Sequence, residues 1–339
     1  MKNHLKAVFM IFIGLAHILW AAAVQSHHSH ANIDRNNIQQ HTGIVSEYSW
    51  TNPHVYLKVM APNPEGDVVE YSIELLHPPG MLSRGWDKDS FSEGDRITWE
   101  GPSDRNPRRY YSGLTWAERG DGTRFTTDKK EESISPTTDF TGLWVRDLRG
   151  ARPFYFPPAE WPYTSLGQEM VDNFNENQNP MLECLEQGPP KATLLPYPIK
   201  ISRPDENTVK FEYELRQHAR IIHLNDSGEP GEPSTWGYSE GRFEGDALVI
   251  ESSNFLADRW GSHTGVHSSD QKYLLETYRI GNDGFSLEVE MTLTDPVYLA
   301  EPVTFDYYLS KMSDRELLDV PCSTRNARLF LEGGYTGTR

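Results

Sequence analysis

Three histidines lie close together near the start of the chain, directly after a hydrophobic run. They are His27, His28 and His30, in the stretch SHHSH. Imidazole nitrogens suit copper and zinc, and copper binds most tightly among the first-row divalent metals. If His27 became the first residue of a mature chain, its amine and ring would form a nitrogen chelate, with His28 or His54 as a further ligand. The alternatives are a solvated, frayed terminus and, for His54, a hydrogen bond to a turn.

The residues before the histidines predict an export signal. Two lysines open the chain, an apolar run follows, and the run ends in small residues. This order is typical of a secretory signal peptide, which we assign to residues 1–26. Cleavage fits after Ala23 or after Ser26, and only the second makes His27 the first residue. A membrane anchor is the alternative, because about 18 apolar residues nearly span a bilayer. Cleavage predicts a periplasmic or secreted protein without a stable membrane anchor.

The charge of the chain and its motifs disfavour several functions. The net charge is −17, and it becomes −19 once the two lysines of the signal are removed. Nucleic acid is therefore not an expected partner, since binding it needs a basic footprint. No G-x-G-x-x-G or H-E-x-x-H motif occurs, so dinucleotide and zincin sites have no support.

The chain has two cysteines, Cys184 and Cys322. An exported chain meets an oxidising compartment, where cysteines pair. We therefore predict a disulfide that closes a long loop and contributes about 4–5 kcal/mol in the chain-entropy model. Two separate buried thiols are the alternative.

A series of strand signals predicts a small β domain over residues 27–125. Three β-branched and aromatic runs come first, at 41–50, 53–62 and 68–76. A helix start follows at Pro78, and two further strand runs follow the helix. Three strands, a helix and two strands are the order of a five-stranded OB-type barrel.

The rest of the chain predicts a linker and a second β domain. Residues 126–138 are charged and then rich in Ser, Thr and Pro, which is typical of a linker. Residues 139–339 are dominated by strand runs, with a helix expected at 159–178. This succession predicts a lipocalin-like barrel, with a β-sandwich as the alternative. The fold class is therefore mainly β.

The second barrel is the expected binding site. An eight-stranded barrel can enclose one small ligand, so we expect a small apolar molecule as partner. The candidate lining residues, which could equally be core, are Trp144, Arg220, Tyr278, Phe305 and Tyr307. The alternative is an enzyme that acts on such a molecule by isomerisation, hydration or hydrolysis. It would use His267 with Asp295 or Glu276 as acid and base. Beyond copper, no cofactor is indicated.

Three motifs give the chain a family resemblance. They are HHS at 27–29, WTNPH at 50–54 and GRFEGDALVI at 241–250. On these motifs the chain resembles a group of exported bacterial proteins of uncharacterised function. Their first domain begins near His-His-Ser and contains W-x-N-P-H. Some carry a second domain with G-R-W-E-G-D-T-L-V-V, from which Phe243 and Ala247 depart here. The resemblance implies a family and no particular reaction.

Overall fold

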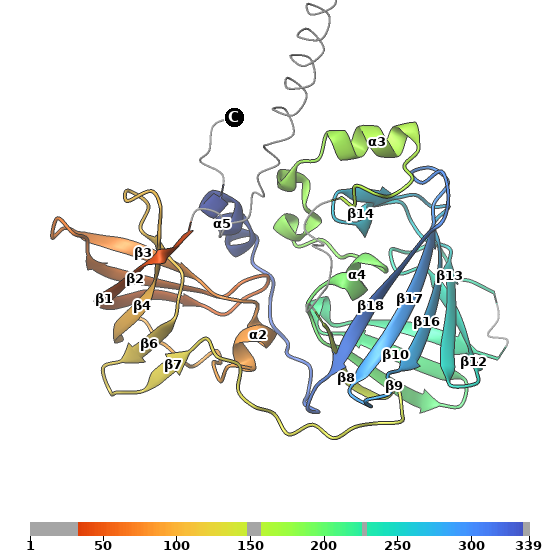
Figure 1. Ribbon diagram of the computed structural model, residues 1–339, viewed down its shortest axis with the longest axis horizontal. Helices are drawn as coiled ribbons and strands as arrows, with labels where there is room; N and C mark the ends of the chain where they lie inside the picture. The colour runs from red at the N-terminus through yellow and green to blue at the C-terminus, as the bar shows by residue number, and fades with distance from the viewer. Residues whose placement is uncertain (1–32, 148–156, 226–228, 335–339) are drawn as a thin grey trace, which may run out of the picture.

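The structure is a computed structural model, and it describes residues 33–147, 157–225 and 229–334. Two β-rich barrels lie side by side (Figure 1). The fold is mainly β, as the sequence predicts. Within the described ranges, none of the helices has the length and apolar character needed to cross a membrane. The predicted signal peptide, 1–26, lies outside the described residues.

The N-terminal barrel is a closed ring of five strands, in the order β1-β2-β3-β5-β4, with β1 pairing β4. The pairs are antiparallel except β3 with β5. A hairpin of β6 and β7 extends the sheet beyond β4. The strands are β1 (Ile33–Ser49), β2 (Tyr56–Pro62), β3 (Val68–Glu74), β4 (Arg96–Asp104), β5 (Tyr111–Ser112), β6 (Trp116–Arg119) and β7 (Arg124–Thr126).

The helix expected near Pro78 is present as α2 (Pro78–Leu82), between β3 and β4 in the chain. Two prolines fit its first turn, where backbone N–H groups have no intrahelical partner. His77 caps the helix, because its Nδ1 accepts the N–H of Gly80 at 3.1 Å. Met81 then enters the barrel core beside Trp86. The helix therefore closes one end of the N-terminal barrel.

The C-terminal barrel is closed by nine strands, in the order β8-β9-β10-β11-β12-β13-β16-β17-β18, with β18 pairing β8. A barrel is confirmed over the sandwich alternative. Neighbouring strands are antiparallel except β11 and β12, which are parallel. The strands are β8 (Gly142–Arg146), β9 (Ile199–Asp205), β10 (Thr208–Tyr213), β11 (His218–Leu224), β12 (Tyr238–Glu244), β13 (Ala247–Ser253), β16 (Tyr273–Ile280), β17 (Ser286–Thr294) and β18 (Val303–Lys311).

Short helices and one hairpin gather over one end of this barrel, which we call its mouth (Figure 1). The helix predicted over 159–178 is wrong in length, since only α3 (Ser165–Asp172) forms. Pro162 precedes it, and Thr164 caps it by accepting the N–H of Gly167. The other elements are η2 (Glu176–Gln178), η3 (Pro180–Glu183), α4 (Lys191–Leu194), η4 (Leu215–Gln217), β14 (Asp258–His263) and β15 (Val266–Ser268).

The chain passes between the barrels twice. Residues 127–141 contain neither helix nor strand and lead from the first barrel to the second. Residues 312–334, which we call the return segment, lead back and end in α5 (Thr324–Gly334). Asn52 binds this segment, since its backbone N–H donates to the carbonyl oxygen of Pro321 at 2.9 Å. The same residue donates its side-chain amide to the Val320 carbonyl at 3.1 Å.

The predicted disulfide is confirmed and fastens the return segment. Cys184 and Cys322 are bonded, with their Cα atoms 6.0 Å apart. Cys184 directly follows η3, and it has a backbone φ of 55°, in the left-handed region that few residues other than glycine adopt. The bond therefore holds the mouth of the second barrel against the segment that reaches the first barrel.

Candidate functional site

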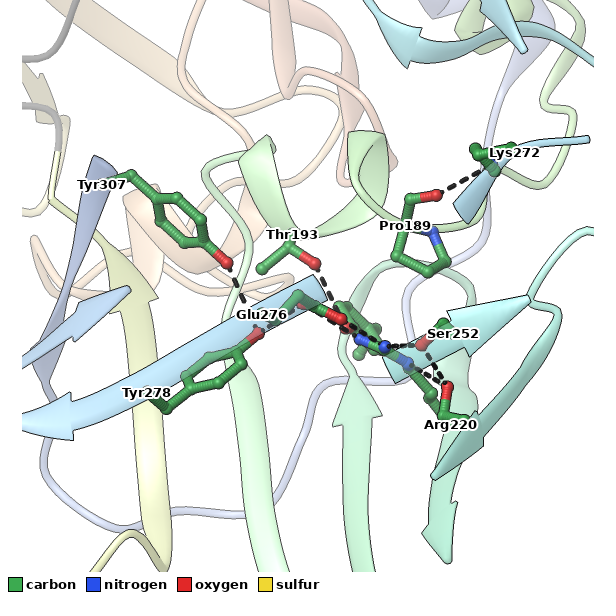
Figure 2. Close-up of polar contacts among 10 residues, drawn as sticks. Pro189, Thr193, Arg220, Ser252, Lys272, Glu276, Tyr278 and Tyr307 are labelled. Atoms are coloured by element: carbon green, nitrogen blue, oxygen red, sulfur yellow. Dashed lines mark hydrogen bonds and ion pairs between the residues drawn. The ribbon is translucent and has the colours of Figure 1, made fainter. Parts of the chain in front are cut away.

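An ion pair lies in the core of the C-terminal barrel (Figure 2). Arg220 of β11 and Glu276 of β16 are 2% and 0% exposed. Alternation along β11 turns Arg220 inward together with Ile222, while Ile221 faces solvent. The guanidinium contacts both carboxylate oxygens, with the Nη1–Oε1 distance at 3.2 Å. Burial alone would lower the pKa of Arg220, but Glu276 raises it above its ordinary value, so the charge is kept.

Hydroxyl groups complete this polar cluster. Arg220 donates Nε to Ser239 at 2.9 Å and Nη2 to Ser252 at 2.7 Å. The Tyr278 hydroxyl donates to Glu276 Oε1 at 2.9 Å and lies 3.4 Å from the Tyr307 hydroxyl. Burial and the Glu276 carboxylate hold the pKa of both tyrosines well above the ordinary value. The ion pair is thus hydrogen-bonded by its own surroundings.

Two buried lysines lie nearer the mouth. Lys272 donates to the Pro189 carbonyl at 2.9 Å (Figure 2). Its ammonium lies 4.1 Å from the ring centroid of Phe255. Burial lowers its pKa to about 8. Lys191 donates to the Thr264 hydroxyl, and burial lowers its pKa to about 7. Each ammonium group therefore donates a hydrogen bond to a neutral oxygen atom.

A small cavity lies at the mouth, and we call it the mouth pocket. It is lined by Met181, Gln187, Leu195, Tyr213, Leu215 and Trp236, among others, and its volume is about 20 Å³. Gln187 and Trp236 are each 6% exposed. Within the part of the chain that the structure describes, neither polar atom of the Gln187 amide has a hydrogen-bond partner, and neither does Trp236 Nε1. Unpaired buried polar groups are rare in folded proteins, and here both polar atoms of one side-chain amide are unpaired.

Aromatic contacts fix the indole of Trp236. The His218 ring stacks on it at 3.9 Å with an interplanar angle of 3°, and Tyr213 contacts it at 4.8 Å. His218 Nδ1 lies 2.8 Å from a carboxylate oxygen of Glu186, which also lines the pocket. Burial lowers the pKa of His218, although Glu186 opposes this. Tyr213 in turn lies 3.3 Å, oxygen to oxygen, from Thr193, so it joins the pocket wall to the barrel core.

The predicted lining residues all lie in or against the barrel core. Arg220, Tyr278 and Tyr307 meet in the polar cluster. Trp144 is not part of this cluster, and its indole N–H donates to the carbonyl oxygen of Phe140 at 2.8 Å. Phe305 is half-buried and stacks on Trp161, 5.8 Å between ring centroids.

The predicted acid–base residues occupy three separate environments. His267 Nδ1 accepts the backbone N–H of Trp260 at 3.3 Å. Asp295 accepts the N–H and the hydroxyl of Ser269, both at 2.7 Å, and so holds a turn. Glu276 belongs to the polar cluster. Across the described ranges, no hydrogen bond or ion pair joins any two of the three, and their acid–base role stays a prediction.

The predicted copper ligands are only partly described. His27 and His28 lie outside the described residues. The Nδ1 atom of His54 lies 2.9 Å from Glu74 Oε1 and 3.0 Å from the Leu75 carbonyl, both at the end of β3. Among residues 33–147, 157–225 and 229–334, no three or more His, Cys, Asp or Glu side chains are grouped to hold a metal ion. The copper chelate therefore stays a prediction.

Sequence reasoning missed the residues that define the mouth pocket. Gln187 lies in an irregular, proline-rich stretch, and Trp236 lies in the loop before β12. Neither belongs to a motif or to a periodic run. The one available signal was the position of Gln187 three residues after Cys184, which a disulfide would fix in space.

Comparison with known proteins gives one match. Residues 16–112 match a family of unknown function, DUF6152. The matched region is less than a third of the chain and reaches β5 of the N-terminal barrel. It agrees with the resemblance to proteins of uncharacterised function, and it does not test the individual motifs. No curated protein matches the chain.

Proposed function

We propose that the protein is exported and binds a small, largely apolar molecule in the mouth pocket of its C-terminal barrel. The observation that carries this proposal is the pair of buried, unpartnered groups, the Gln187 amide and the Trp236 indole N–H. A buried polar group left without a hydrogen bond destabilises a protein by about 1–3 kcal/mol. A bound molecule that supplies those hydrogen bonds would remove this destabilisation.

The composition of the pocket supports the same proposal. Ligand sites are mostly apolar, with a few polar groups that set orientation. Met181, Leu195 and Leu215 supply apolar walls here, and Tyr213 supplies an aromatic wall. Exposed residues at its edge, Leu185 and Glu186, give the pocket access to solvent. The cavity has room for about one ordered water as it stands. A larger ligand has to push its walls apart, so an experiment has to distinguish the two occupants.

The disulfide supports export. Structural disulfides persist in oxidising compartments and are rare in reducing ones. The Cys184–Cys322 bond therefore fits a periplasmic or secreted location. It also lies three residues from Gln187, so an oxidising compartment would keep the pocket wall in place.

Native mass spectrometry of the protein, purified without denaturation, tests the proposal. We expect a retained small molecule on the natural protein and none on the Gln187→Leu variant. The matched control is Gln39→Leu, because Gln39 is an exposed glutamine on β1 of the other barrel. This control should retain the molecule.

Thermal unfolding gives a second readout. Without ligand, Gln187→Leu should be as stable as the natural protein or more stable, because it removes an unpaired buried amide. An extract of the expressing cells should raise the Tm of the natural protein and of Gln39→Leu only. The proposal is overturned if no mass is retained and the extract shifts all three proteins equally.

A further inference from the structure

The two buried lysines of the C-terminal barrel have opposite surroundings. Lys191 is 4% exposed and Lys272 is 2% exposed. The ammonium of Lys272 faces the ring of Phe255, which attracts a cation. Burial lowers the pKa of Lys272, but the carboxylates of Asp258 and Asp295 oppose this. The positive charge of Lys272 is therefore compensated by its neighbours.

Lys191 has no such compensation within the described ranges. It opens α4, and its one hydrogen bond there goes to the hydroxyl of Thr264, in the turn between β14 and β15. The charge that acts on it is a second cation, Arg146 of β8. Arg146 donates to the carbonyl of Leu194, at the other end of α4. Burial first, and Arg146 second, lower the pKa of Lys191 to about 7.

This environment favours a neutral amine and, beyond that, an anion. A buried lysine beside another cation is a nucleophile at neutral pH, because part of it carries no proton. A protonated Lys191 would place two like charges in the barrel, whereas a negative group at the same position would pair with the Arg146 guanidinium. The other N–H positions of the Lys191 amine have no hydrogen-bond partner among the described residues, so a new bond on nitrogen breaks none of them.

We propose that Lys191 is a modification site, at which the amine reversibly adds carbon dioxide and the resulting carbamate is held by Arg146 and Thr264. The nitrogen lone pair forms a bond to the carbon of carbon dioxide, one carbon–oxygen π pair moves onto oxygen, and the nitrogen loses one proton to the solvent. Carbon dioxide is uncharged, so it enters a buried site without the desolvation that an ion needs. The modification is independent of the ligand of the mouth pocket.

The carbamate has a structural consequence. Its oxygens accept from the guanidinium of β8 and from the hydroxyl in the β14–β15 turn, and both are charge-assisted hydrogen bonds. Because Lys191 belongs to α4, these bonds join the barrel wall, the helix and the hairpin over the mouth. Dissolved carbon dioxide would therefore stabilise the mouth of the barrel.

Carbon NMR of the full, oxidised chain in isotopically labelled bicarbonate tests the proposal. We expect a carbamate resonance, separate from those of bicarbonate and dissolved carbon dioxide, on the natural protein. The Lys272→Met variant should keep this resonance, and Lys191→Met should lose it. The absence of a carbamate resonance from the natural protein at saturating bicarbonate would overturn the proposal. Identical carbamate resonances on the natural protein and on Lys191→Met would also overturn it.

A second pair of variants keeps the lysine, so it tests the site even if Lys191→Met fails to fold. Thr264→Val removes the hydroxyl that binds the carbamate. It should raise the bicarbonate concentration at half occupancy by at least about tenfold, the effect of one hydrogen bond to a charged group. The matched control is Thr193→Val, because Thr193 is a buried threonine of α4 whose hydroxyl lies 3.3 Å from that of Tyr213. The control should leave half occupancy unchanged, and equal values for both variants would contradict the site.

Discussion

Arg220 and Glu276 come from different strands of the C-terminal barrel, and their charged groups pair where neither side chain reaches solvent. Removing one member of such a pair leaves an uncompensated buried charge. Arg220→Met should lower the free energy of unfolding by about 3–5 kcal/mol. The double variant Arg220→Met with Glu276→Leu should recover most of this loss, as measured by urea unfolding. Equal stability of the single and double variants would contradict the prediction that the unpaired Glu276 charge causes the loss.

The disulfide should be the largest single covalent contribution to stability. Its cysteines are separated by 138 residues, and the chain-entropy model gives about 5 kcal/mol for a loop of that length. The double variant Cys184→Ser with Cys322→Ser should lose stability of that order in urea unfolding. The natural protein in excess dithiothreitol serves as the control and should fall to the same value. No change on reduction would show that the bond does not constrain the unfolded chain.

His77 should make the protein sensitive to acid. Burial, with the charges of His54 and Arg84 nearby, lowers the pKa of His77 to about 3. As pH falls, the unfolded chain therefore takes up a proton on His77 before the folded protein does. The free energy of unfolding then falls by up to about 1.4 kcal/mol for each pH unit below 6.5. His77→Asn keeps a cap for α2 and removes the titration. Its stability should fall less between pH 6.5 and 4.5; parallel pH profiles for the two proteins would rule this out.

His54 should have the opposite effect. Burial alone would lower the pKa of His54, but the Glu74 carboxylate and the Leu75 carbonyl raise it above its ordinary value. The charged pair therefore stabilises the fold fully below pH 6.5, and this contribution is lost as pH rises through the folded-state pKa. The stability advantage over His54→Gln should shrink from pH 6 to pH 8.5. Parallel stability profiles for the two proteins over this range would contradict the prediction.

The strands could be predicted because side chains alternate wherever one face of a sheet is buried. In β4, Ile97 and Trp99 are buried and Arg96 is exposed, and this pattern is visible in the sequence. The parallel pairing of β11 with β12 was not predictable in the same way. It depends on how the loop between them crosses the barrel, and loop paths have no periodic signal.

Sequence reasoning predicted only part of the candidate site. Arg220, Tyr278 and Tyr307 were expected in the barrel because they lie in strand runs, and the structure brings them together. Gln187 and Trp236 come from irregular segments whose positions depend on packing and on a disulfide. Their distinguishing property is the lack of a partner, and that property exists only in three dimensions.

The return segment bears on the order in which a growing chain can finish folding. Asn326 in α5 donates its amide to the hydroxyl groups of Ser49 and Thr51, and Ser49 lies 277 residues earlier in the chain. Leu329 packs beside Tyr56 and Tyr111 on the same barrel. The first barrel thus emerges from the ribosome long before the residues that cover this side of it. Throughout synthesis of the second barrel, the nascent chain leaves an aromatic face open to chaperones and to unwanted association.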